Sequence, residues 1–501
     1  MSLKQKTITG VAWNGAANIA RQALQILSLI VMARFLSPDD FGVYAILMIF
    51  VTFMNIFTSM GVSQVIIHLD NPDQRMLSSI FYLNMAVGIA LFGLFYLLAW
   101  PIADFFDNQI IVHLLQIIGC SFIITALTVV QKSLLEKYLH FKRVVTLETI
   151  ALTISSITGI VAAIAGLGIY SLLIATLLNA SIFSIGIWLN SHWRPSPMFA
   201  FGDIRQIMSY SLNLTGFSII NYFARNADKF LIGKFWGSSA LGVYSVAYKI
   251  MLYPLDNVSG VIIRVLFPAF SQVKHDNPRF KNSYLKTISL IALVTFPVMA
   301  GMLVVARPLV AVIFGEKWQG LSTLLMTLAP IGMVQSIVTT VGSIYTAKGT
   351  TALMFKIGAA NAVVTVISFV IGLPFGVEGV AIAYAIANAI MLFPNLKISW
   401  DQIDLGVLEG LGKLMPFFVA SAVMAAMVNF QGAWLAVNNL SPLLVLSLQV
   451  LTGIFLYVGV LFLFHRQLIL SLLGELRNKT TNANLSLFNN PGGLTEVEDS
   501  K

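Results

Sequence analysis

Hydrophobic runs long enough to cross a membrane recur along almost the whole chain, and they constrain the fold more than any other feature. A helix needs about 20 mostly apolar residues to span the hydrocarbon core of a bilayer. Fourteen candidate spans lie at approximately 10–34, 40–62, 78–100, 109–131, 146–166, 168–190, 208–233, 240–266, 284–305, 322–346, 355–374, 377–397, 411–431 and 442–464. The seventh and eighth of them are unusually polar. The sequence therefore predicts an all-α integral membrane protein with about 14 transmembrane helices.

Composition agrees with a chain that faces lipid more than water. Of the 501 residues, 57% are hydrophobic and 10% are charged, whereas soluble domains carry about 25% charged residues. The net charge of +9 does not indicate nucleic acid, because the basic residues sit in short loops between apolar runs. The single cysteine, Cys120, can form no internal disulfide and no cysteine-based metal cluster. The first run is too long and too polar for a signal peptide and is expected to remain as a span.

The distribution of lysine and arginine predicts the orientation of the chain. With the N-terminus in the cytoplasm, 21 of the 30 basic residues fall on the cytoplasmic side and four on the other side, with five inside spans. The four are Arg34, Lys234, Arg307 and Lys317. Cytoplasmic loops carry the excess of basic residues in membrane proteins, so both termini are predicted to be cytoplasmic.

An internal repeat relates the two halves of the chain. The segment 33–44, ARFLSPDDFGVY, matches 233–244, GKFWGSSALGVY, with Phe, Gly, Val and Tyr identical. Further matches pair Pro101 with Pro308, and pair Gly168, Ile174 and Ala175 with Gly376, Ile382 and Ala383. The offsets of these three windows form one consistent register. Repeats with an even number of spans share an orientation, as in parallel-repeat transporters.

The repeat predicts four regions along the chain. Residues 1–205 form an N-lobe of spans one to six, and residues 206–400 form a C-lobe of spans seven to twelve. Residues 401–470 hold spans thirteen and fourteen. The polar tail 471–501 is expected to be a disordered cytoplasmic segment. Two like-oriented lobes leave a central cleft between them in which a substrate can sit.

Polar residues inside spans one, seven and eight mark that cleft. A basic side chain at the bilayer centre costs about 2.5–3.5 kcal/mol even on the lenient insertion scale, so it must face a cavity, pair or snorkel. Helical spacing places the polar residues of span one on one face, and those of span seven on another. The predicted lumen residues are Asn14, Asn18, Arg21, Asn221, Arg225, Asp228, Lys229, Tyr248 and Lys249.

Two interpretations of these residues remain open. In the first, they line an anion-binding lumen, in which arginine holds phosphate, lysine supplies a point charge and aromatic rings stack on sugars. Asp228 can pair with Arg225, three residues earlier on the same face. In the second, they form only inter-helix hydrogen bonds and interfacial anchors.

Several chemistries have no motif in the chain. There is no G-x-x-x-x-G-K-[ST] and no H-E-x-x-H sequence, and the six histidines are scattered near loops and span ends. The sequence therefore predicts no catalytic residue, no metal site and no cofactor. Transport would draw on an ion gradient, whose ion stays open, or on the gradient of the substrate.

Four segments in order resemble colanic-acid-exporter-like proteins, from the polysaccharide-transport branch of the multidrug/oligosaccharidyl-lipid/polysaccharide exporter superfamily. They are MSLKQKTITGVAW at 1–13, ARFLSPDDFGVY at 33–44, RVLFPAF at 264–270 and FGEKW at 314–318. The resemblance covers roughly residues 1 to 470. It implies a Wzx-like flippase of the bacterial inner membrane, built on the fold shared by MATE exporters and MurJ.

The resemblance also implies cargo and mechanism. Such proteins move undecaprenyl-pyrophosphate-linked oligosaccharide repeat units to the outer leaflet by alternating access, for surface polysaccharides such as lipopolysaccharide, exopolysaccharide and capsule. The expected partners are this lipid-linked substrate, the bilayer and a polymerase or co-polymerase of the same pathway. Two alternatives remain: a MATE-like small-molecule cation antiporter, which would need a more acidic lumen, and a membrane polysaccharide polymerase or ligase, which typically needs a sizeable periplasmic loop.

Overall fold

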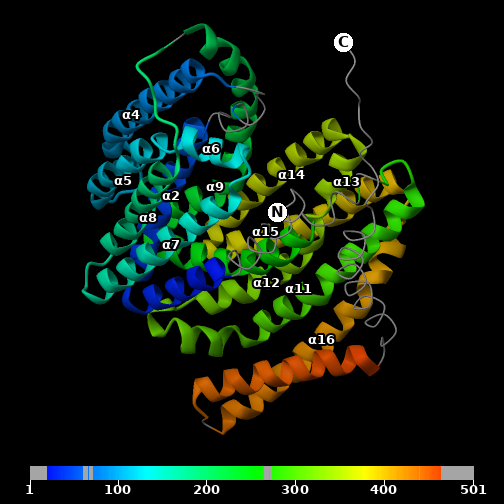
Figure 1. The fold of residues 1–501 in the computed structure, drawn as a ribbon. Coiled ribbons are helices and arrows are strands. Elements are labelled where there is room, and N and C mark those ends of the chain that lie inside the picture. Colours follow the sequence, from blue (N-terminus) through cyan, green and yellow to red (C-terminus); the bar gives the residue numbers. More distant parts are fainter. Residues whose placement is uncertain are drawn as a thin grey trace. The chain divides into compact units, whose positions relative to one another are not determined.

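The computed structural model describes residues 20–59, 66, 72–199, 201–263, 270, 273–438 and 440–463, without the side chains of 201–221, 224, 436 and 437 (Figure 1). Regular secondary structure in these residues is entirely helical. The chain divides into two compact units. Unit 1 contains Met1–Lys249, Leu309–Leu324 and Gly358–Ala387, and unit 2 contains Ile250–Pro308, Leu325–Ile357 and Asn388–Lys501. The structure therefore confirms the prediction of an all-α fold.

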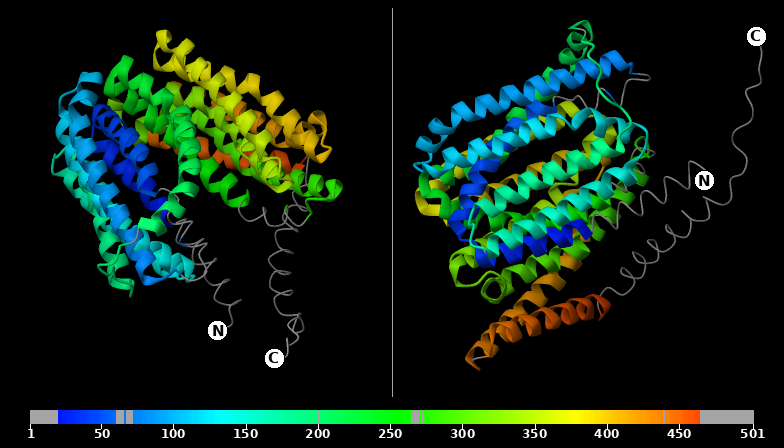
Figure 2. Two further views of the ribbon diagram at one scale, coloured as in Figure 1. Left: turned by 90° about the horizontal axis from the view of Figure 1, so that it is seen from above. Right: turned by 60° about the vertical axis from the view of Figure 1, so that its left-hand side comes forward.

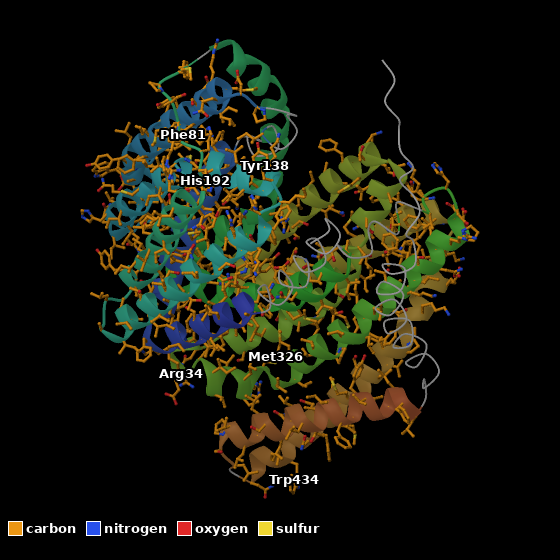
Figure 3. All side chains as sticks on the ribbon, viewed as in Figure 1. Arg34, Phe81, Tyr138, His192, Met326 and Trp434 are labelled. Atoms are coloured by element: carbon orange, nitrogen blue, oxygen red, sulfur yellow. The ribbon has the colours of Figure 1, made fainter. Side chains whose placement is uncertain are left out.

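Unit 1 is formed mainly by the first half of the sequence. Its helices are residues 20–35, α2 (Pro38–Ser59), α4 (Gln74–Phe105), α5 (Ile110–Ala126), α6 (Val129–Lys137), α7 (Phe141–Ile164), α8 (Tyr170–Asn190) and most of α9 (Phe201–Pro254). Helices α4 and α5 run side by side, as do α7 and α8 (Figure 2). At one end of this unit, Phe81 packs against Trp188 and Trp193, near His192 (Figure 3).

Local sequence signals explain where several of these helices begin. Ser37 precedes Pro38 and forms a capping box with Asp40, because Asp40 accepts from the Ser37 amide at 2.8 Å and donates its own amide to the Ser37 hydroxyl at 3.2 Å. Asp73 caps α4 by accepting from the Met76 amide at 2.7 Å.

A break in α9 separates the seventh predicted span from the eighth. Gly237 has φ 80° and ψ 176° inside α9, a backbone conformation that is open to glycine and costly for other residues. It stands two hundred positions after Ser37, at the same place in the repeat. Gly168 and Gly376, which the repeat also pairs, likewise share positive φ values of 52° and 83°. These pairs agree with the repeat register read from the sequence.

Unit 2 is formed by later helices, some of which extend into unit 1. The elements are the π-turn Leu255–Ser259, α11 (Asn277–Ile313), α12 (Leu321–Val338), α13 (Val341–Lys348), α14 (Thr351–Gly372), α15 (Gly376–Trp400), α16 (Val407–Val437) and the helix Pro442–Leu463. The buried Tyr284 hydroxyl contacts Thr340 Oγ1 at 2.6 Å and accepts from Trp400 Nε1 at 3.1 Å. Tyr457 donates to the Leu293 carbonyl at 2.8 Å and so attaches the last helix to α11.

Apolar helices of spanning length account for most of the predicted spans. Among the described residues, nine helical segments are long and apolar enough to cross a membrane, and the bent pair α5–α6 makes a tenth. One of the nine, Thr351–Ile403, joins the eleventh and twelfth predicted spans, which are the separate helices α14 and α15. The other predicted spans are the first, which starts outside the described residues, and the polar seventh and eighth in α9. Fourteen spans are compatible with this structure, and the chain is a multi-pass membrane protein.

The charge bias makes a prediction about sidedness. In a Cys120→Ser background, Glu316→Cys should react with a membrane-impermeant maleimide added to intact cells, because Glu316 lies in a loop predicted to face away from the cytoplasm. His275→Cys lies in a predicted cytoplasmic loop and should react only after the cells are permeabilised. Equal labelling of both positions in intact cells would contradict the predicted topology.

Candidate substrate lumen and closure

Unit 1 contains every predicted lumen residue, although not all of them can be placed. Asn14 and Asn18 lie outside the described residues, and Asn221 lies in α9 with its side chain outside the described set. Arg21 lies on the helix 20–35. The other predicted residues lie on α9, on both sides of the break at Gly237.

Asp228 is buried and held by α9 itself. Its residue is 2% exposed, and its carboxylate accepts from the Tyr244 hydroxyl and from the Lys229 amide, each at 2.8 Å. A buried carboxylate requires such donors. Tyr244 is the last residue of the repeated segment and lies beyond the break. The bonding partner seen for Asp228 is therefore Tyr244, and the hydrogen bond joins the two halves of α9.

Lys229 and Tyr248 lie together beside this pair. The Lys229 ammonium lies 5.7 Å from the centre of the Tyr248 ring, within range of a cation–π interaction. Tyr248 stacks on Tyr244 with ring centres 5.9 Å apart, and its hydroxyl lies 3.5 Å from that of Tyr384 on α15. Tyr244 and Tyr384 are buried, and Tyr248 is the partly exposed ring of the three. Tyr384 did not stand out in the sequence, although the repeat register aligns it with Thr176, which bonds the Tyr44 hydroxyl at 2.8 Å.

Arg225 and Lys249 are both exposed. No ion pair joins Arg225 to Asp228 among the described residues, so the pairing suggested by their spacing is not what the structure shows. Arg225 lies about one helical turn before Lys229 on α9, and Lys229 contacts Tyr248.

Arg21 belongs to a separate cluster of charges. Its guanidinium binds the Glu148 carboxylate on α7. The other oxygen of Glu148 lies 3.7 Å from Lys132 Nζ on α6, and Lys132 also lies 3.8 Å from Glu136. Sequence reasoning missed Glu148, even though an acidic residue within the predicted span 146–166 was the signal that could have found it.

The two repeated segments meet at a close, symmetric helix crossing. A β-carbon on Gly42 would overlap the backbone of Ser238, and a β-carbon on Gly242 would overlap the carbonyl of Pro38. These two contacts are equivalent under the repeat. Glycine allows such backbone approach between membrane helices. Ser238 also donates to Asp39. The crossing thus joins the starts of the second and eighth spans, at the end that the charge bias places outside, here called the outer end.

Further contacts strengthen the closure at the outer end. Buried Trp318 donates to the Ala33 carbonyl at 2.8 Å and packs edge-on against Phe41. Arg34, at the end of the helix 20–35 (Figure 3), donates to the Val312 carbonyl. Lys234 binds Asp107 at 2.9 Å. Arg34 and Lys234, which the charge distribution places on the non-cytoplasmic side, therefore have partners on other segments of the chain.

An apolar pocket of about 790 Å³ lies in unit 1. Its walls come from α2, α4, α9 and α14, and its lining is apolar except for a few side chains such as Asn226 and Tyr222. Val363, Ile367 and Val370 line it and are more than half exposed, so the pocket opens on an exposed apolar face of α14. Apolar cavities of this kind stay dry and take up apolar ligands.

Two solved structures share the fold of this chain. It matches the lipid II flippase MurJ in an inward closed conformation, with a TM-score of 0.75, 18% identity and coverage of 91% of this chain and 99% of that one. It also matches an inward-facing multidrug MATE transporter, with a TM-score of 0.63, 16% identity and coverage of 76% and 94%. At these identities the likeness concerns the fold alone.

The family model described as polysaccharide biosynthesis protein matches residues 31–323, so the chain belongs to that family. Its relatives include the lipopolysaccharide biosynthesis protein WzxC of Escherichia coli, 24% identical over 86% of this chain and 90% of the relative. The succinoglycan biosynthesis transport protein ExoT of Rhizobium meliloti is 24% identical over 96% of this chain and 98% of the relative. The predicted resemblance to this family is confirmed.

The symmetric crossing makes a prediction. Gly42→Ala or Gly242→Ala should destabilise the closed outer end by about 1–3 kcal/mol through overpacking, which shifts the conformational balance roughly tenfold. Export of surface polysaccharide by a complemented deletion strain should fall accordingly at equal protein level. Gly93→Ala is the control, because a β-carbon there meets open space. Normal export by both gate variants would contradict the role of the crossing.

Proposed function

We propose that this protein is a flippase of a bacterial inner membrane, with cytoplasmic termini, that moves undecaprenyl-pyrophosphate-linked oligosaccharide repeat units from the cytoplasmic to the periplasmic leaflet. The observation that carries the proposal is the set of cationic and aromatic side chains inside unit 1 of a polysaccharide biosynthesis family member. These side chains are Arg21, Arg225, Lys229, Tyr248 and Lys249. The curated relatives named for lipopolysaccharide and succinoglycan biosynthesis support the same class of cargo.

Each part of such a cargo has a matching surface. The pyrophosphate, or an acidic sugar, suits the arginine fork and the lysine charge. A sugar ring suits the partly exposed ring of Tyr248 beside Lys229. The isoprenoid chain suits the apolar pocket that opens on the exposed apolar face of α14. The protein binds and releases this cargo and makes no bond in it.

The alternating-access cycle follows from the outer-end crossing. Closure there rests on backbone contacts of Gly42 and Gly242 and on the bonds of Trp318 and Arg34. Opening must break these contacts together, because packed interfaces switch between discrete arrangements. In this cycle the outer end is closed while cargo enters from the cytoplasm, and it opens when the cytoplasmic end closes. Net movement is outward when a polymerase outside consumes the delivered repeat units.

A small-molecule cation exporter fits the same residues less well. The carboxylate that would recognise a cation, Asp228, is buried and already bound by Tyr244 and by a backbone amide. Among the described side chains of α9, the exposed charged ones, Arg225 and Lys249, are cationic. A drug-sensitivity panel that showed protection by this protein, with unchanged polysaccharide export in its absence, would favour the exporter.

The leaflet on which cargo accumulates separates a flippase from a polymerase or ligase. A depletion strain should accumulate lipid-linked repeat units on the cytoplasmic leaflet of its inner membrane. Accumulation on the periplasmic leaflet would favour a polymerase or ligase.

The arginines give the sharpest mutational test. Arg21→Ala and Arg225→Ala should each lower polysaccharide export at least tenfold at unchanged protein level, because each removes about 1.5–3 kcal/mol of charge-assisted binding. The matched control is Arg279→Ala, since Arg279 is 78% exposed and pairs only with Asp276 within the described contacts. Export that survives both lumen substitutions would refute the proposed anion site.

The apolar pocket gives an independent test. Ala362→Trp should fill the pocket and lower export several-fold, while leaving the binding of inorganic pyrophosphate by the purified protein unchanged. The control is Ile371→Trp on the same helix, at a position 62% exposed and outside the pocket lining. Equal export by the two tryptophan variants would show that the pocket does not hold the lipid chain.

A further inference from the structure

The charge cluster around Glu148 suggests how the anion site behaves when no cargo is bound. We propose that Glu148 is an intramolecular counter-ion that occupies Arg21 in the empty carrier and that the cargo's phosphate must displace. This inference rests on the proposed flippase function. It assigns a role to Glu148, an acidic residue outside the predicted set of lumen residues. The cluster comprises Arg21, Lys132, Glu136 and Glu148, whose formal charges cancel.

Geometry distinguishes this cluster from a buried structural ion pair. The side chains of Arg21, Glu148 and Lys132 are 20%, 32% and 37% exposed, so an incoming anion can reach all three. The residues come from three elements, the helix 20–35, α7 and α6, and not from one turn of one helix. A displaced carboxylate at this site would remain accessible to water, which lowers the cost of breaking the pair.

Lys132 is placed to respond when Glu148 moves. It lies 3.7 Å from Glu148 and 3.8 Å from Glu136, both near the upper limit for an ion pair, and so it is shared between two carboxylates. Glu136 is four residues further along α6, on the same helical face. When a phosphate draws Arg21 away from Glu148, the lysine can stay compensated by Glu136, or contact the phosphate itself.

The empty carrier needs such a counter-ion. After cargo is released, the helix carrying Arg21 must return with its charge within a membrane-spanning bundle, where an uncompensated arginine is costly. Glu148 provides the compensation without a bound anion. The same carboxylate weakens cargo binding, because the phosphate has to compete with it. Weak binding favours release on the far side of the membrane.

The test uses the purified full-length protein in detergent, with inorganic pyrophosphate as the probe and isothermal titration calorimetry at fixed ionic strength. Glu148→Gln should bind pyrophosphate about tenfold more tightly than wild type, the factor expected when one competing charged hydrogen bond is removed. Its export in cells should fall several-fold, because release and return are slowed. Glu148→Ser serves as a second variant if the glutamine variant folds poorly.

Two control variants separate the counter-ion role from a structural one. Glu136→Gln removes the same charge from the same lysine and should leave the pyrophosphate affinity within twofold of wild type, because the Arg21–Glu148 pair stays intact. Glu148→Asp retains the carboxylate and should keep both affinity and export near wild type. Unchanged or weaker pyrophosphate binding by well-folded Glu148→Gln and Glu148→Ser would overturn the proposal.

Arg21→Ala shows which of the two proposals has failed. Loss of pyrophosphate binding in Arg21→Ala, with unchanged binding in Glu148→Gln, would leave the anion site in place and remove only the counter-ion role. Unchanged binding and export in Arg21→Ala would remove the anion site, and the counter-ion role with it.

Discussion

The intolerance of a bilayer for uncompensated charge governs this molecule. Insertion of an arginine at the bilayer centre costs about 2.5–3.5 kcal/mol of free energy even on the most lenient scale. Each charged side chain in a span therefore needs a compensating partner or a functional role. The structure supplies partners of different kinds: a carboxylate for Arg21, an aromatic face for Lys229, and a tyrosine for the carboxylate of Asp228. Each partner fixes the relative position of two helices or of two halves of one helix.

The outer closure combines charged contacts of Arg34 and Lys234 with a helix crossing that uses none. The symmetric crossing depends on the absence of side chains at Gly42 and Gly242, which lets two helix starts meet backbone to backbone. Its polar bonds, such as Trp318 to Ala33, satisfy carbonyls that a helix end leaves open. The contact between the two glycines can break and re-form without separating an ion pair.

Much of the fold could be read from the sequence because its signals are periodic or repeated. Apolar runs predicted the spans. The segments at 33–44 and 233–244 predicted a repeat, and Gly168 and Gly376, which the repeat pairs, both have positive φ values in the structure. The sequence showed that Gly42 and Gly242 occupy the same position of the repeat. It did not show that both lie at a close helix crossing. The spatial meeting of Gly42 with Ser238 depends on the packing of two distant helices, which no local pattern encodes.

The candidate site was predictable only in part, for the same reason. Helical spacing collected Arg225, Asp228 and Lys229 on one face, yet spacing also suggested an Arg225–Asp228 pair where the structure pairs Asp228 with Tyr244. Tyr244 lies beyond a glycine break, so a straight-helix pattern could not relate the two. Glu148 was missed because its partner, Arg21, is 127 residues away.

The helix 20–35 takes part in both the charge cluster and the contacts at the outer end. Arg21 lies near its described start, and Ala33 and Arg34 contact the outer closure near its end. Arg21 and Arg34 lie thirteen residues apart, which corresponds to about 20 Å of helix at a rise of about 1.5 Å per residue. A helix transmits displacement along its axis because its backbone hydrogen bonds resist compression. Exchange of Glu148 for a phosphate at one end therefore acts on the same rigid element whose other end is bound by Trp318 and Val312. Such a shared element, biased from both ends, is the physical requirement for coupling between two sites.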